Sequence, residues 1–211
     1  MAGNPAIEDA GRRPELVVIA GPNGSGKTTI SRRLLQHAWG RECLFLNPDE
    51  IAQNEFGNWN SPEAILRAAR QAEQLREECL GQRKSVLFET VFSAPDKPNY
   101  IRRAKEAGFF IRFFFVCTDD PAINLHRILR RFGEGGHTVP SDKVLSRYRK
   151  SISQCADIIG HVDRAYIYDN SVEDAAPALL FRTTNGAQKK LYRDPVNAWA
   201  RPILKALQPR P

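Results

Sequence analysis

The spacing of apolar residues along the chain predicts strands that alternate with helices. Five short apolar runs are typical of buried strands: Glu15–Ala20, Cys43–Leu46, Ser85–Phe88, Phe109–Cys117 and Ala165–Tyr168. One further run, Leu179–Thr184, is expected to form an edge strand. Segments with helical spacing follow most of the strands: Lys27–His37, Pro62–Gly81, Pro98–Ala107, Pro121–Phe132 and Pro140–Ile159. This alternation predicts an α/β fold, a mostly parallel sheet with helices on both faces.

Prolines mark two of the element boundaries. Ser61 precedes Pro62, and this pair predicts a helix with serine as the N-cap and proline at the first helical position. Pro48 excludes the preceding Asn47 from the helical region. Asp49 is therefore expected at the end of a strand or at the start of a helix.

The segment between the first strand and the first helix predicts a phosphate loop. It has the spacing Gly-x4-Gly-Lys-Thr, in which glycines let main-chain amides approach phosphate oxygens. The N-terminus of the following helix would face the same anion. Lys27 is expected to reach the outer phosphates of ATP, and Thr28 to bind Mg²⁺. The expected nucleotide-binding residues are Gly21, Pro22, Asn23, Gly24, Ser25, Gly26, Lys27, Thr28 and Thr29.

Polar residues at the ends of two other strands are candidates for phosphoryl transfer. Ligands bind beyond the carboxyl ends of parallel strands, so Asp49, Glu89 and Thr90 are expected to gather around the loop. Asp49 could accept a proton from the phosphate acceptor, or it could simply cap a helix. Glu89 could hold Mg²⁺ or bind the acceptor, or it could be a solvated acid. Thr90 and Ser93 are candidates for hydrogen bonds to the acceptor, although such residues are common in loops.

The charge of the chain is concentrated in one segment. The net charge is +7, and residues 126–150 contain seven Lys or Arg against two acids. This concentration favours a phosphate-facing lid over a nucleic-acid surface. Arg127 and Arg131 share one helix face, with Arg130 beside them, although an exposed basic face is the alternative interpretation. His137 follows two glycines and is a candidate ligand-binding residue or a plain loop residue.

Length and composition indicate a single domain. We expect a flexible leader over residues 1–13 and one P-loop kinase domain over residues 14–211, with an arginine-rich lid at about 121–150. No apolar run is long enough to span a membrane, and the N-terminus lacks a secretory signal. The four cysteines have no zinc-site spacing and suit a reducing compartment, so a cytoplasmic protein is expected.

The ordered set of motifs resembles the zeta-toxin-like P-loop kinases, in their stand-alone branch. The resemblance covers roughly residues 15–171 and rests on six segments: 21–29 (GPNGSGKTT), 47–52 (NPDEIA), 88–93 (FETVFS), 135–140 (GGHTVP), 147–151 (RYRKS) and 168–171 (YDNS). The better-known members are toxins of bacterial toxin–antitoxin pairs. They phosphorylate the 3′-hydroxyl of the amino sugar in UDP-N-acetylglucosamine.

The resemblance implies a role for each matching residue. It implies Lys27 as the phosphate lysine, Thr28 as a Mg²⁺ ligand, Asp49 as the base on the acceptor hydroxyl, Glu89 as an acceptor-binding carboxylate, and Arg127 or Arg131 as a lid arginine. Two positions depart from the toxins. His137 stands where they carry a second lid arginine, and Glu89-Thr90-Val91 replaces their Glu-Gly-Thr. Both departures leave ATP use intact and leave the acceptor open.

Three functions follow from these patterns. The leading one is an ATP- and Mg²⁺-dependent kinase acting on a hydroxyl of a nucleotide sugar or similar metabolite, with an antitoxin protein as a candidate partner. The second is a nucleic-acid end-processing kinase or ATPase, which the sequence pI of 9.4 would suit. The third is a regulatory ATP-binding module without an acceptor. Binding to nucleic acid would weaken steeply with salt, whereas turnover of a small molecule would not.

Overall fold

A computed structural model describes residues 12–59, 61–133 and 139–207. These residues form a seven-stranded sheet in the order β2-β3-β1-β4-β5-β6-β7. The strands are β1 (Glu15–Ala20), β2 (Leu44–Leu46), β3 (Val86–Thr90), β4 (Phe110–Cys117), β5 (Arg164–Asp169), β6 (Ala178–Thr184) and β7 (Ala187–Leu191). The first five strands pair in parallel, and β6 and β7 add antiparallel pairs. The predicted α/β fold with a mostly parallel sheet is confirmed.

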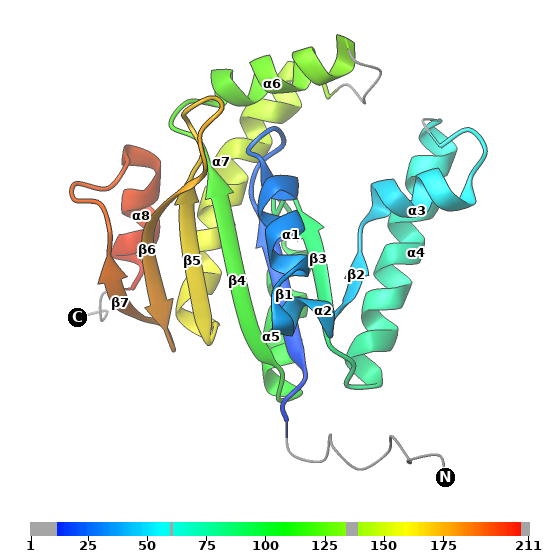
Figure 1. Cartoon of the computed structure of the whole chain (residues 1–211), viewed down its shortest axis with the longest axis horizontal. Coiled ribbons are helices and arrows are strands. Elements are labelled where there is room, and N and C mark those ends of the chain that lie inside the picture. The colour runs from blue at the N-terminus through cyan, green and yellow to red at the C-terminus, as the bar shows by residue number, and fades with distance from the viewer. Residues whose placement is uncertain (1–11, 60, 134–138, 208–211) are drawn as a thin grey trace.

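Helices cover both faces of the sheet (Figure 1). They are α1 (Lys27–Leu35), α2 (Ala38–Arg41), α3 (Pro48–Glu55), α4 (Pro62–Gly81), α5 (Asp96–Glu106), α6 (Pro121–Gly133), α7 (Ser141–Ile158) and α8 (Arg201–Lys205), with 3-10 turns η1 (Ile159–His161) and η2 (Ala198–Ala200). Helix α1 packs on one face, and α5 and α7 pack on the other. No helix of the described residues is long and apolar enough to cross a membrane.

The apolar residues of the strands place the sheet at the centre of the hydrophobic core. Every residue of β1 is buried, and β1 has a partner strand on each side. The larger apolar cluster joins the sheet to α5 and α7, and includes the rings of Phe88, Phe113 and Phe115. Burying an aromatic ring of this size stabilises the fold by about 1.5–3 kcal/mol. The central position of β1 places the loop that follows it at the middle of the sheet edge.

One strand prediction was wrong in detail. The run predicted as an edge strand became β6, an inner strand, because the chain turns at Asn185-Gly186 and adds β7 outside it. Both turn residues have positive φ, as a tight hairpin of this kind requires. Helix α3 was not among the expected helices, but Asp49 was expected at the end of a strand or the start of a helix, and it lies at the start of α3. The predicted N-cap Ser61 is confirmed, since its side chain accepts a hydrogen bond from the amide of Ala64.

Candidate active site

The phosphate loop joins the end of β1 to the start of α1. Gly24 and Gly26 adopt φ values of +74° and +93°, which side-chain-bearing residues rarely reach. Helix α1 has Gly26 as its N-cap and no side chain that caps its first turn. The start of α1 therefore has no side-chain cap among the described residues, and the helix dipole favours negative charge there. This backbone fits a phosphate group.

The electrostatics of Lys27 indicate which charged groups surround the loop. Its Nζ donates hydrogen bonds to the carbonyl oxygens of Gly21 and Pro22, at 2.9 and 3.0 Å. Burial lowers the pKa of Lys27 to about 8; Glu89 and Asp49 oppose this fall, and Arg131 adds to it. Residues from three other parts of the sequence therefore lie close enough for their charges to act on the ammonium group of Lys27.

Glu89 lies at the end of β3 and faces helix α1. Its carboxylate accepts hydrogen bonds from Thr28 Oγ1 at 3.2 Å and from Ser31 Oγ at 2.6 Å. The described residues contain no group of three or more His, Cys, Asp or Glu that could hold a metal. Mg²⁺ commonly uses one or two protein ligands beside phosphates and water, so the Thr28–Glu89 pair fits this ion. Sequence reasoning missed Ser31, although it lies on the Thr28 face of the helix, three residues further on.

Asp49 is the second residue of α3 and is exposed. The N-cap of this helix is Asn47, whose side chain accepts a hydrogen bond from the amide of Asp49 at 3.0 Å. The alternative interpretation of Asp49 as a helix cap was therefore wrong. Proline at the first helical position fixes this arrangement, because Pro48 has no amide to be capped. The carboxylate of Asp49 has no hydrogen bond among the described residues.

The other candidate residues on the acceptor side have different surroundings. Thr90 Oγ1 accepts a hydrogen bond from the amide of Phe92, and the Thr90 carbonyl accepts one from the amide of Gly21. Thr90 thus links the end of β3 to the phosphate loop. Ser93 is half-buried. His137 lies outside the described residues.

A cavity of about 460 Å³ adjoins the phosphate loop, and all three arginines of α6 line it. Arg127 donates to the carbonyl oxygen of Asn170 at 2.8 Å, and Arg130 forms an ion pair with Glu173. Both contacts tie α6 to the segment between β5 and β6. Arg131 is exposed, lines the cavity and has no hydrogen bond or ion pair within the described residues. Of these three side chains, that of Arg131 is therefore the one with no protein partner to give up on binding a ligand, as far as the described residues show.

Long-range hydrogen bonds hold the phosphate loop in place. Asn124 Nδ2 donates to the carbonyl oxygen of Asn23 at 2.6 Å, and Arg147 donates to the side chain of Asn23 at 3.2 Å. Asn170 Nδ2 donates to the carbonyl oxygen of Ser25 at 2.8 Å. These partners lie 101, 124 and 145 residues apart in the sequence. No local signal could have revealed Asn124, whereas Arg147 and Asn170 belong to the quoted motifs.

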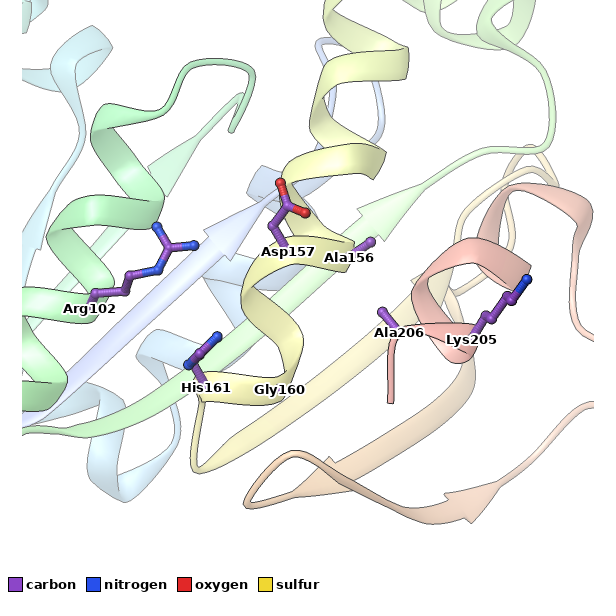
Figure 2. A pocket seen from close by; sticks show the side chains of 7 residues that line it. All are labelled: Arg102, Ala156, Asp157, Gly160, His161, Lys205 and Ala206. Atoms are coloured by element: carbon purple, nitrogen blue, oxygen red, sulfur yellow. The ribbon is translucent and has the colours of Figure 1, made fainter. Parts of the chain in front are cut away.

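A second hollow, of about 580 Å³, lies away from these residues. Its lining comes from α5, α7, η1 and α8: Arg102, Ala156, Asp157, Gly160, His161, Lys205 and Ala206 (Figure 2). The hollow lies near the start of β5, whereas the phosphate loop follows the end of β1. Because β1 and β5 run in the same direction, the hollow and the loop lie at opposite edges of the sheet. None of the predicted site residues lines it, so it is not part of the candidate active site.

Solved structures share this fold. A chain of the AvrRxo1-ORF1:AvrRxo1-ORF2 complex with ATP superposes with a TM-score of 0.65 at 19% identity, covering 95% of this chain and 65% of that one. A chain of the PezAT chromosomal toxin-antitoxin system of Streptococcus pneumoniae superposes with a TM-score of 0.61 at 19% identity, covering 79% of this chain and 71% of that one. The present chain thus spans just under two thirds of its AvrRxo1 counterpart. At such identities the likeness concerns the fold.

Sequence comparison identifies the family. An uncharacterized protein of Haemophilus influenzae is 30% identical over 132 residues, which are 63% of this chain and 91% of that protein. Residues 3–175 match the family model described as Zeta toxin, and this match spans the phosphate loop, Asp49, Glu89 and helix α6. The chain therefore belongs to the zeta toxin family of P-loop kinase-fold proteins.

Proposed function

We propose that this chain is an ATP- and Mg²⁺-dependent kinase that phosphorylates a hydroxyl of a nucleotide sugar similar to UDP-N-acetylglucosamine. The observation that carries the proposal is the pair of hydrogen bonds from Thr28 and Ser31 to Glu89. They put a hydroxyl and a carboxylate beside the phosphate loop, as phosphoryl-transfer enzymes require. Thr28 and Glu89 would hold Mg²⁺, which when bound neutralises charge on phosphate oxygens.

Each remaining residue would then have a chemical task. Lys27 would exchange its two loop carbonyls for phosphate oxygens, because a charged acceptor binds an ammonium group more strongly than a neutral one. Arg131 would donate to the phosphoryl group as negative charge develops on it. Asp49 would orient the acceptor hydroxyl and accept its proton. In this proposal, residues 14–211 act as one kinase domain with a lid at about 121–150.

The comparisons support two further parts of the proposal. One relative of the same fold was solved with ATP, and another belongs to a toxin–antitoxin system. We therefore include ATP as the donor and an antitoxin protein as the natural partner. Expression of the chain in a bacterial host should slow growth, and expression of the Asp49→Asn variant should not. Equal growth of both cultures would count against toxicity by phosphoryl transfer.

The direct test is to incubate the purified chain with γ-labelled ATP, Mg²⁺ and one acceptor at a time. The acceptors are UDP-N-acetylglucosamine, a metabolite extract, an oligonucleotide with a free 5′-hydroxyl, and water alone. Label on the nucleotide sugar or on a metabolite supports the proposal. Label on the oligonucleotide alone, lost steeply with added salt, would establish the nucleic-acid kinase instead. Release of phosphate without any labelled acceptor would leave only an ATPase.

A further inference from the structure

Helix α6 contains a buried amide side chain that the proposed chemistry does not use. Asn124 lies near the start of α6 and is fully buried, with 0% of its surface exposed. A buried amide must be hydrogen-bonded to be tolerated, since an unpaired amide costs about 1–3 kcal/mol. Both ends of the Asn124 side chain are in fact satisfied. The identity of its partners indicates what the residue is for.

Asn124 is the middle link in a chain of hydrogen bonds that ends at the phosphate loop. Tyr148 of α7 donates to the carbonyl oxygen of Thr118, and the hydroxyl of Thr118 donates to Asn124 Oδ1. Asn124 Nδ2 then donates to the carbonyl oxygen of Asn23. Tyr148, Thr118 and Asn124 are buried, and Asn23 is half-buried, so most of this hydrogen-bond chain is shielded from water. Hydrogen bonds in such surroundings are stronger and more directional than at the surface.

The backbone of Asn124 makes a second contact with the same loop. A Cβ atom placed on Gly24 would lie 2.5 Å from the carbonyl oxygen of Asn124 and 3.0 Å from its Cα. The first turn of α6 therefore packs directly against the main chain of the phosphate loop. Main-chain packing and the side-chain hydrogen bond fix the same two segments to each other.

The position of Asn124 on its helix links this contact to the arginines. Arg127 and Arg131 follow it at spacings of three and seven residues, so all three side chains share one face of α6. With a rise of about 1.5 Å per residue, Arg131 lies about 10 Å along the helix from the fixed point. An error in the direction of the first turn would therefore be carried along the helix to the guanidinium of Arg131.

We propose that Asn124 is a positioning residue, which pins the start of the lid helix to the phosphate loop and thereby sets where Arg131 meets the transferring phosphoryl group. The inference rests on the proposed kinase function. In the Asn124→Leu variant, a side chain of similar size lacks both hydrogen bonds. Misplacement of a catalytic group by about 1 Å can cost about 100-fold in rate, so kcat should fall by about this factor. The KM for ATP should change little, because the loop amides and Lys27 remain.

The test is a double-mutant cycle with Arg131→Ala, supported by hydrogen exchange. If Asn124 acts through Arg131, adding Asn124→Leu to the Arg131→Ala enzyme should cost less than about threefold in kcat. Thr183→Val is the matched control, because it also replaces a buried polar side chain, on strand β6. It should leave kcat unchanged. The Asn124→Leu change alone should accelerate amide exchange across residues 121–133 in the ATP-free protein.

The outcomes separate the inference from the function on which it rests. Full loss of about 100-fold in both backgrounds would overturn the positioning role, since a purely structural defect acts without regard to Arg131. Unchanged exchange in α6 would also overturn it, even in a fully active kinase. If the wild-type chain transfers no phosphoryl group at all, the proposed function fails. Accelerated exchange in Asn124→Leu would still show that Asn124 holds the start of α6 against the phosphate loop.

Discussion

Replacement of Gly26 by alanine should destabilise the fold through two separable effects. Gly26 has φ of +93°, a left-handed conformation that costs an L-residue about 1–2 kcal/mol. Its new Cβ would also lie 2.2 Å from Asn170 Nδ2, so the Asn170 side chain must rotate away. That rotation breaks the hydrogen bond to the Ser25 carbonyl, worth about 1 kcal/mol. The expected loss of unfolding free energy is therefore about 2–3 kcal/mol.

The two effects can be separated by removing the Asn170 side chain first. Asn170→Ala alone should cost about 1 kcal/mol, because only the hydrogen bond to Ser25 is lost. In the double variant no side chain remains to clash, so the total should stay at about 2–3 kcal/mol. Simple addition would give about 3–4 kcal/mol, and the cycle should therefore show a coupling of about 1 kcal/mol.

Urea unfolding followed by tryptophan fluorescence measures these free energies, since the chain contains three tryptophans. Gly81→Ala is the reference variant, because Gly81 ends helix α4 and nothing lies within 4 Å of its added Cβ. That variant should be neutral or more stable by up to about 1 kcal/mol. If the effects of Gly26→Ala and Asn170→Ala simply add, the described contact does not operate. If Gly26→Ala behaves like Gly81→Ala, the strain argument is also refuted.

Three further predictions concern the site and the stability of the fold. Lys27→Ala should abolish phosphoryl transfer without lowering the thermal midpoint, because burial disfavours the charged form of Lys27 in the free protein; a large drop in the midpoint would contradict this. Asp49→Asn should leave ATP affinity nearly unchanged and cut transfer by about 100-fold or more, measured by nucleotide titration beside turnover; a parallel loss of ATP binding would make Asp49 a metal or structural residue. Asp163 is buried, and although burial raises its pKa, the Ile111 amide and Lys105 prevail and hold the pKa below its usual value. The folded state therefore gains stability from this carboxylate above about pH 4 and loses it as pH falls further. Asp163→Asn should show a deficit in unfolding free energy at pH 7 that shrinks by pH 3; a constant deficit would exclude the linkage.

The sequence was sufficient to predict those elements whose signals lie within a few neighbouring residues. The phosphate loop combines an apolar strand, spaced glycines and a helix start, and Ser61 caps α4 by the ordinary pairing with a proline. Asn47 precedes Pro48 in the same way and is the N-cap of α3, but Asp49 was considered for that role because aspartate is also favoured at N-caps. Strand β7 was missed because its positions are mostly exposed and its apolar pattern is weak. Its preceding Asn-Gly turn was the available clue.

The sequence could not show contacts that depend on the finished fold. Arg127, Arg130 and Arg131 are the same residue type, and only the structure shows that two of them bond to the β5–β6 segment while Arg131 has no hydrogen bond or ion pair among the described residues. Asn124 is a polar residue in an amphipathic helix, and polar residues of such helices are usually exposed to solvent. Its burial follows from the approach of α6 to a loop 101 residues away in the sequence.

The central place of β1 also determines when the phosphate loop can first be held in place during synthesis. Its two neighbours in the sheet, β3 and β4, are both synthesised after it, and β4 ends at Cys117. At about 5–20 residues per second, roughly 5–20 seconds separate the emergence of β1 from completion of the second pairing. During that interval the phosphate loop has no rigid strand behind it. The loop can therefore take up its final geometry only after the residues through Cys117 have been made.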